Sequence, residues 1–163
     1  MSKALRGLSV FIRIGIAAAC AAAAIIMATS HDSTSFFGVT MEAKYQYTPS
    51  FKFFVIANAI ASGYNVLVVF VPAASPLSGL VIMSDILVAM LLTGALAATG
   101  AISELGKHGN IHAGWLPICK QIPAYCDHVS GSLISAFVGL IVFVAITLCN
   151  IYKIVSLDLH VCH

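Results

Sequence analysis

Four long apolar stretches dominate the chain, separated by short segments that carry most of the polar residues. The stretches run over about residues 8–29, 53–71, 80–102 and 133–152. A helix needs about 20 apolar residues to cross a bilayer, and each stretch is close to that length. The runs are unbroken, whereas a membrane β-barrel shows alternation with a period of two. The pattern predicts an all-α membrane protein, a single domain built as a four-transmembrane-helix bundle.

Composition supports this fold class. The 163-residue chain is 60% hydrophobic and 9% charged, whereas an ordinary soluble domain carries about 25% charged residues. Among its 8 basic and 6 acidic side chains, only Arg13 and Asp85 fall inside the predicted spans. The composition argues against a soluble enzyme and against a disordered chain. A net charge of +2 is too weak to indicate a nucleic-acid partner, so the main partner that we expect is the lipid bilayer.

An even number of spans places both chain ends on one side of the membrane. Lys3 and Arg6 precede the first span, and basic residues at that position favour a cytoplasmic amino terminus. The first span also resembles a secretory signal, but its apolar run exceeds the roughly 7–15 residues of a signal core, so we expect it to be retained. The loops over about residues 30–52 and 103–132 then face outward, and the connector over residues 72–79 is cytoplasmic.

Arg13 and Asp85 are the two charges inside the spans. Each costs about 2.5–3.5 kcal/mol near the bilayer centre, which disfavours an unpaired charge. The first and third spans run in the same direction, and both residues lie roughly 7–8 Å from the same membrane face at about 1.5 Å rise per residue. We predict a buried ion pair that locks the two spans together. One alternative is an ion pathway. The other is that both side chains snorkel to the interface without pairing.

Small residues recur at every fourth position on three spans, a spacing that predicts close helix approach. They are Gly15, Ala19 and Ala23 in the first span, Gly94 and Ala98 in the third, and Gly131, Ser135 and Gly139 in the fourth. The spacing does not distinguish contacts within one chain from contacts between copies. In the second span, Asn58 and Asn65 share a helix face, and we predict interhelical hydrogen bonds for both, with a ligand site as the alternative.

The positions of the cysteines and histidines limit which disulfides, redox sites and metal sites the chain can form. Cys119 and Cys126 lie in the second outer loop, where an oxidising compartment favours a disulfide, while Cys20, Cys149 and Cys162 are expected as free thiols. No C-x-x-C redox pair occurs, and no histidine lies inside a span to ligate haem. His108, His112 and His128 lack a defined fourth metal ligand, and the same holds for the tail group that comprises His160, Cys162 and His163. We therefore predict no catalytic residues, no metal and no cofactor.

The junction of the first outer loop and the second span carries the most specific motif, YQYTPSFKFFVIANAIASGY over residues 45–64. It resembles the corresponding region of the first subgroup of the plant Casparian-strip membrane-domain-like (CASP-like) proteins. Arg13 in the first span, Asp85 in the third, and the paired cysteines after Trp115 also fit that family, so the resemblance covers nearly the whole chain. The first outer loop does not resemble the signature of the members that form the strip itself.

The resemblance implies a multi-pass plasma-membrane protein with cytoplasmic termini that forms homo-oligomers and hetero-oligomers with related members. Founding members of the family scaffold membrane domains and recruit lignin-polymerising enzymes of the wall, which implies a non-catalytic scaffold outside the strip for this chain. Aromatic residues of the loops fit either partner contacts or a belt at the headgroups. The alternative function is a small channel, a transporter or an auxiliary subunit of a membrane complex. A claudin-like seal is disfavoured, because the first outer loop has no cysteine.

Overall fold

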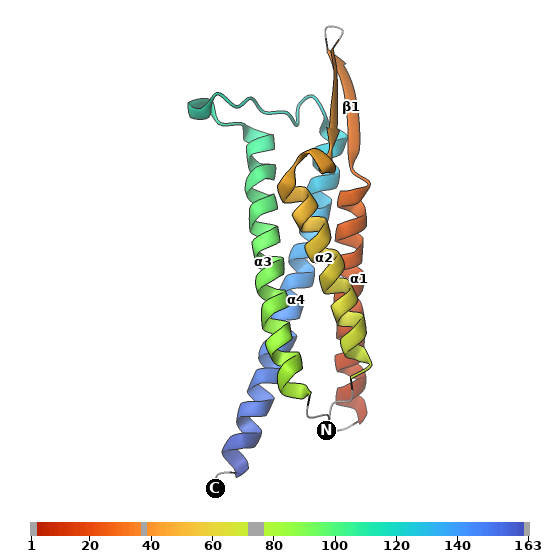
Figure 1. Ribbon diagram of the computed structural model, residues 1–163, viewed down its shortest axis with the longest axis vertical. Helices are drawn as coiled ribbons and strands as arrows, with labels where there is room; N and C mark the ends of the chain where they lie inside the picture. Colours follow the sequence, from red (N-terminus) through yellow and green to blue (C-terminus); the bar gives the residue numbers. More distant parts are fainter. Residues whose placement is uncertain (1–2, 37–38, 72–76, 162–163) are drawn as a thin grey trace.

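The computed structural model describes residues 3–36, 39–71 and 77–161. Its architecture is a bundle of four long helices (Figure 1). Each helix is long and apolar enough to cross a membrane, which confirms the four-span all-α prediction. The helices are α1 (Lys3–Ala28), α2 (Pro49–Val69), α3 (Ser78–His108) and α4 (Pro123–Val161).

Each helix begins before its apolar run, and α3 and α4 also continue past the end of theirs. Local sequence explains where α2 begins and where α3 ends. Helix α2 begins with Pro49 in its first turn, a position where the missing N–H of proline is not needed. Helix α3 ends at His108, and the following Gly109 has a φ of 68°, which glycine adopts readily. Because α3 extends to His108 and α4 begins at Pro123, the segment that joins them spans residues 109–122.

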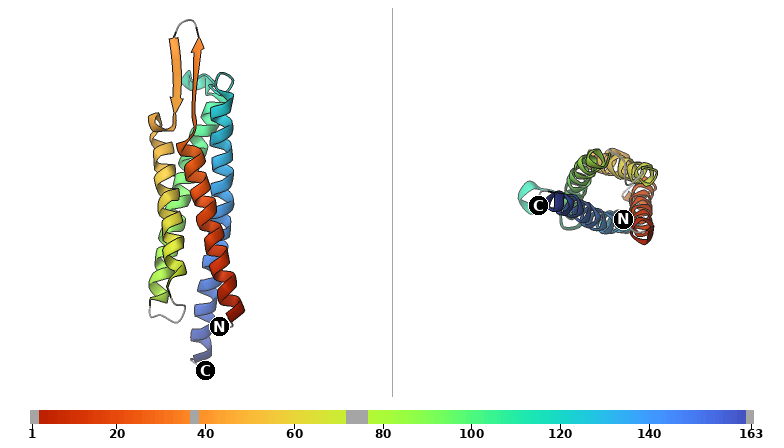
Figure 2. Two further views of the ribbon diagram at one scale, coloured as in Figure 1. Left: turned by 90° about the vertical axis from the view of Figure 1, so that its right-hand side faces the viewer. Right: turned by 90° about the horizontal axis from the view of Figure 1, so that it is seen from below.

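The four helices form a ring in which each packs against two neighbours. Helix α1 contacts α2 and α4, and α3 contacts the same two helices, so α1 and α3 lie diagonally across the bundle (Figure 2, right). Helix α1 begins and α4 ends at one end of the bundle (Figure 1), which we call the termini end. The opposite end is called the hairpin end. The connector predicted over residues 72–79 lies largely outside the described residues.

The segment that the sequence predicts as the first outer loop forms a β-hairpin, which sequence analysis did not predict. Strands β1 (His31–Phe36) and β2 (Val39–Lys44) pair antiparallel, with His31 opposite Lys44. The hairpin projects beyond the helices at the hairpin end (Figure 2, left). Strand β2, with the sequence VTMEAK, alternates strictly between apolar and polar residues and carried a strand signal. Strand β1, with the sequence HDSTSF, is polar except for its last residue, so its pairing could not be read from periodicity. A short 3-10 helix, η1 (Tyr45–Tyr47), leads from β2 into α2.

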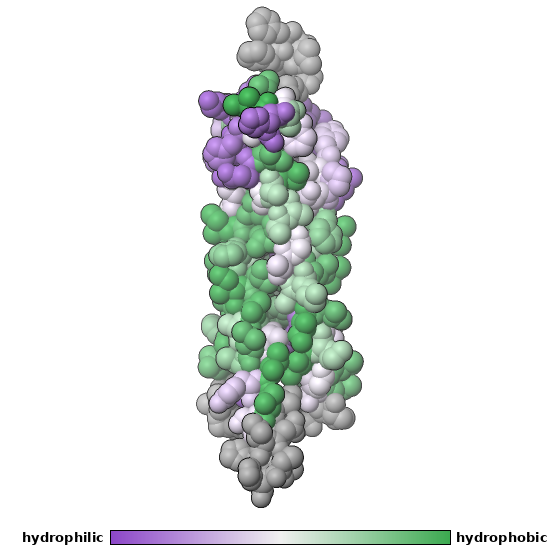
Figure 3. Space-filling view, turned by 90° about the vertical axis from the view of Figure 1, so that its left-hand side faces the viewer, coloured by the Kyte–Doolittle hydropathy of each residue, from purple (hydrophilic) through white to green (hydrophobic). Residues whose placement is uncertain are grey.

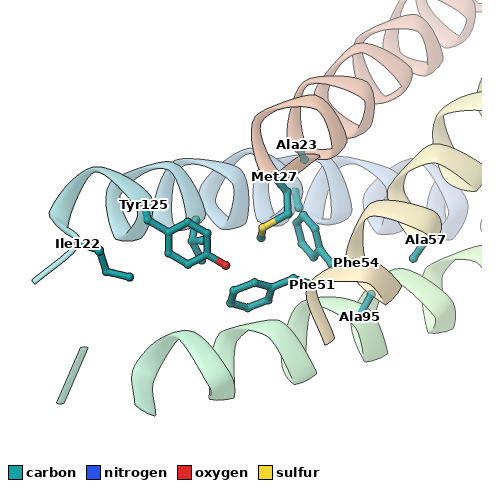
Figure 4. Packing of buried hydrophobic residues seen from close by; sticks show 10 residues of the cluster. Ala23, Met27, Phe51, Phe54, Ala57, Ala95, Ile122 and Tyr125 are labelled. Atoms are coloured by element: carbon teal, nitrogen blue, oxygen red, sulfur yellow. The ribbon is translucent and has the colours of Figure 1, made fainter. Parts of the chain in front are cut away.

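The core contains two groups of buried side chains, one in each half of the bundle. Toward the hairpin end, Met27, Phe54 and Phe51 pack near Tyr125 (Figure 4). In the other half of the bundle, Phe143 and Ile16 are fully buried against Cys20. The face drawn in Figure 3 is apolar over the middle of the bundle, while hydrophilic residues gather at the hairpin end. This distribution matches a bundle that is surrounded by lipid.

Helices α1 and α4 approach closely because small residues face each other. Ser132 donates a hydrogen bond from Oγ to the carbonyl oxygen of Ala23 at 2.8 Å, and Ser135 donates likewise to Ala19 at 3.1 Å. A Cβ atom added at Gly139 would lie 3.3 Å from the Cβ of Ala19. Ala19, Ala23, Ser135 and Gly139 therefore act in helix packing within one chain.

Within the described residues, the remaining predicted packing glycines do not contact another helix of the same chain. Gly15, Gly94 and Gly131 are exposed, and a Cβ added at any of them would meet no atom within 4 Å. On α3 the buried neighbour is Ala95, and Ala98 is half-buried. Successive residues of a helix are rotated by about 100°, so a shift of one position moves a small residue from the interior to the surface.

Substitution of Gly139 by valine should destabilise the bundle, whereas Gly131→Val on the same helix should not. The added side chain at position 139 collides with Ala19, and overpacking typically costs about 1–3 kcal/mol. Position 131 has open space, and both variants carry the same β-branched residue. Thermal unfolding followed by circular dichroism in mild detergent measures the difference. Equal midpoints for the two variants would contradict the α1–α4 contact.

Candidate functional site

Four polar side chains meet inside the bundle, and we call Arg13, Tyr64, Asn65 and Asp85 the polar cluster. Nη2 of Arg13 lies 2.7 Å from Oδ2 of Asp85, and Nη1 lies 3.1 Å from Oδ1. Arg13 is 4% exposed and Asp85 is 0% exposed. Two parallel charge-assisted bonds of this kind fix both side chains in position. The structure thus brings together the two intramembrane charges that the sequence singles out.

Helix α2 completes the cluster with two adjacent residues. Nη1 of Arg13 also donates to Oδ1 of Asn65 at 3.3 Å. The hydroxyl of Tyr64 lies 2.7 Å from Oδ1 of Asp85 and 3.0 Å from the carbonyl oxygen of Val81, so its single proton has two acceptors within reach. The cluster therefore joins α1 and α3 across the diagonal and fastens both of them to α2.

Helix α4 covers this region with apolar side chains. Phe143 and Ile146 belong to the core group that also contains Ile16 and Val88, with Tyr64 packed against it. The positive and negative charges of the cluster neutralise each other in surroundings of low dielectric constant, where breaking the pair is costly. This geometry suits a structural lock, since each charged group is occupied by a fixed partner.

The two asparagines of α2 behave differently. Asn65 makes the interhelical hydrogen bond to Arg13, and its Nδ2 donates to the carbonyl oxygen of Ala61 at 2.9 Å. Asn58 is 1% exposed, and its Nδ2 donates within its own helix to Phe54 at 2.9 Å. Its Oδ1 accepts no hydrogen bond from the described residues. The prediction of an interhelical hydrogen bond therefore agrees with the contacts of Asn65. Asn58 makes no interhelical hydrogen bond to any of the described residues.

Several hydroxyl groups that sequence analysis did not single out also join helices. Ser62 on α2 donates to the carbonyl oxygen of Ala17 at 2.9 Å, and Thr99 on α3 donates to that of Ser50 at 3.2 Å. Ser132 serves the same purpose on α4, as described above. Serine and threonine inside apolar spans are common interhelical donors, and that signal could have identified these positions.

At the hairpin end, a disulfide joins Cys119 to Cys126, as predicted. The backbone N–H groups of Ile118 and Cys119 donate to the carbonyl oxygen of Gly106 at 3.0 and 3.3 Å. The segment between α3 and α4 is thereby fastened to both helices. Cys20 is a buried free thiol and Cys149 an exposed one; the prediction for Cys162 concerns a residue outside those described.

A pocket of about 150 Å³ lies beside this disulfide. Phe51, Ile102 and Val129 contribute apolar side chains, while Glu42 and Lys44 of β2 stand among its polar lining residues. Lys44 lies 2.6 Å from Glu42 and lowers the pKa of that carboxyl group, chiefly through their hydrogen bond. Ligand pockets usually measure about 300–1,000 Å³, so this one is suited to a single side chain or a very small molecule.

The histidines do not assemble a metal site in the described part of the chain. No group of three or more His, Cys, Asp or Glu residues there is placed to hold a metal ion. Nδ1 of His108 instead lies 2.8 Å from Glu104, one turn earlier on the exposed end of α3. The side chains of His160 and His163 are not among those described.

Comparison with known proteins gives a consistent result over nearly the whole chain. The family model of the Casparian strip membrane protein domain matches residues 2–142. CASP-like protein 1C1 of Sorghum bicolor is 54% identical over 135 residues, which cover 83% of each chain. CASP-like protein 1C3 of Populus trichocarpa is 45% identical over 96% of this chain and 91% of its own. CASP-like protein 1C1 of Arabidopsis thaliana is 43% identical over 96% and 94%. No solved structure matches the chain.

Removal of one charge of the buried pair should destabilise the bundle strongly. Asp85→Leu leaves Arg13 uncompensated, and Arg13→Met leaves Asp85 uncompensated, at a cost of about 3–5 kcal/mol each. The double variant removes both charges and should recover most of that loss. Unfolding of the two single variants and the double variant in mild detergent gives the coupling free energy.

The exposed pair of Glu42 and Lys44 is the matched control for this cycle. The same substitutions there should leave the unfolding midpoint nearly unchanged, because water screens an exposed pair. Strictly additive effects at positions 13 and 85 would show that the two charges do not stabilise each other.

The two asparagines should also respond differently to leucine, a residue of similar size. Asn65→Leu removes an acceptor from Arg13 and should destabilise by about 1–3 kcal/mol. Asn58→Leu removes a buried carbonyl oxygen that accepts no bond from the described residues, so stability should stay equal or rise. The same unfolding assay compares them, and a larger loss for Asn58→Leu than for Asn65→Leu would refute this assignment.

Proposed function

The chain belongs to the Casparian strip membrane protein domain family, and on that premise we propose that it is a non-catalytic scaffold of the plasma membrane. It associates with copies of itself and with related family members. In this way it organises a membrane domain or recruits cell-wall-modifying partners to the outer surface. The protein's contribution is the position that it gives to its partners, and it needs no reaction of its own.

The outward glycines are the observation that carries this proposal. Gly15, Gly94 and Gly131 lie on three different helices and face away from the bundle. In lipid, apolar contact alone gives helices little reason to associate, and small residues favour association because they let backbones approach closely. Glycines that serve no contact within the chain are therefore suited to contacts between chains.

The disulfide supports the orientation of this scaffold. Disulfides persist in oxidising compartments and are rare in the cytosol. The bond between Cys119 and Cys126 lies at the hairpin end, so we assign that end to the outer side and the termini end to the cytoplasm. The hairpin and the segment over residues 109–122 are then the parts that a wall-side partner would meet.

Gly94→Leu should weaken self-association without unfolding the protomer, because position 94 is exposed and has open space around it. The bulkier side chain separates the backbones of two copies, and we expect the association constant to fall about tenfold, which is roughly 1.4 kcal/mol. Single-molecule photobleaching in nanodiscs, over a range of protein densities, measures the oligomer distribution. Gly15→Leu and Gly131→Leu test the other two faces in the same way.

Ala145→Leu is the matched control, since Ala145 is exposed on α4 beside the large residues Ile141 and Leu148. It adds the same bulk where no small-residue face exists, and association should not change. If the unmodified chain stays monomeric at every density, the scaffold proposal fails. If all three glycine variants behave like the control, association uses another surface.

A further inference from the structure

The segment between α3 and α4 exposes apolar side chains that no part of the described chain covers. We call residues 110–116 the loop tip; it includes the short helix η2 (Ile111–Ala113). Ile111 is 94% exposed, Leu116 80% and Trp115 55%. Exposed apolar residues that lie together generally mark a surface for a partner or for a membrane.

The loop tip is a rigid turn. The N–H of Asn110 donates to the carbonyl oxygen of Trp115 at 2.8 Å, and the N–H of Trp115 donates back to Asn110 at 2.9 Å. Oδ1 of Asn110 accepts from the N–H groups of His112 and Ala113. A Cβ added at Gly109 would lie 2.5 Å from the carbonyl oxygen of Trp115, so the turn requires glycine there. The apolar side chains therefore stand on an ordered support.

The loop tip extends sideways from the bundle. In two perpendicular views, η2 lies outside the outline of the four helices (Figures 1 and 2). Gly109 follows the last apolar residue of the third predicted span, Ile102, by seven positions, or about 10 Å at 1.5 Å per residue. The headgroup layer on each side of a bilayer is roughly 5–8 Å thick. The backbone of the loop tip thus lies beside the bundle at the outer edge of the headgroup layer, where the nearest surface is the membrane and long side chains directed toward it reach into that layer.

The charge and residue types of this segment fit a phospholipid surface. From Leu105 to Cys126 the sequence contains Lys107 and Lys120 but no acidic residue. Lysine ammonium groups donate charge-assisted hydrogen bonds to phosphate oxygens, which every phospholipid headgroup carries, and tryptophan is enriched at the boundary between headgroups and acyl chains. A copy of the same chain that met it loop to loop would present this same basic segment and offers no such complementarity.

We propose that the loop tip docks on the phospholipid bilayer at the hairpin end, with Ile111, Trp115 and Leu116 entering the boundary between headgroups and acyl chains. This is a membrane contact in addition to the four spans, and it is independent of the scaffold role. It holds the disulfide-closed segment flat against the membrane.

Trp115 is the one tryptophan of the chain, so its fluorescence reports directly on the loop tip. The full chain is placed at one copy per nanodisc, in phosphatidylcholine whose acyl chains are either brominated or unmodified. Brominated lipid should lower the emission about twofold, since an interfacial tryptophan lies within contact of the acyl chains. Aqueous iodide should quench the same emission only weakly.

Two variants sharpen this measurement. Ile111→Ser combined with Leu116→Ser removes the flanking apolar side chains, so emission should shift to the red and quenching by brominated lipid should fall. His112→Ser changes an exposed polar residue of the same turn and should leave both signals unchanged. An intact disulfide and an unchanged circular dichroism spectrum confirm that the variants are folded.

Two outcomes would overturn the proposal. Strong quenching by iodide with no effect of brominated lipid would place Trp115 in water. Emission that becomes protected only when a disc holds two copies would assign the loop tip to contacts between protomers. Because the decisive measurement uses single copies, failure of the scaffold proposal would not affect its result.

Discussion

The structure depends on a constraint that Arg13 and Asp85 impose together: neither charge can remain unpaired inside the membrane. Their helices lie diagonally across the bundle, yet two bonds of 2.7 and 3.1 Å connect the side chains. The pair sets the relative depth of α1 and α3, because a shift of either helix along its axis would separate the charges. Tyr64 and Asn65 extend the same constraint to α2, whose rotation is set by the need to reach both partners.

A bond across the diagonal requires the helices to approach closely, and the small core residues make this possible. Ala23, Cys20 and Ala61 are fully buried near the bundle centre, where larger side chains would push the helices apart. Helix α4 contributes no charged residue to the polar cluster and is held instead by Ser132, Ser135 and Gly139 against α1. Polar attraction joins three helices, and close packing joins the fourth to them.

The predictable features are those that depend on composition and depth along a single helix. Span positions follow from apolar runs, and the pairing of Arg13 with Asp85 follows from equal depth on parallel spans. The rotation of a helix about its own axis is harder to predict from sequence, because it is determined by all contacts of the helix at once. The four-residue spacing on α4 therefore included Gly131 on the outer face and missed buried Ser132 beside it. The hairpin was missed for a different reason: β2 alternates between apolar and polar residues, but β1 is polar except for its last residue, so one of the two partner strands gave no periodic signal.

Internal pairing also determines which surfaces remain for partners. Since the charges within the spans neutralise each other, contacts with lipid and with other chains must use the outer faces of the helices and the ends of the bundle. Gly94 lies midway along α3, whereas the loop tip begins two residues beyond the end of that helix. Under the two proposals made above, one helix offers a face for another chain within the hydrocarbon and carries, at its end, a turn suited to the membrane surface. A protomer associated through Gly94 can keep its loop tip on lipid, because the two contacts lie at different depths.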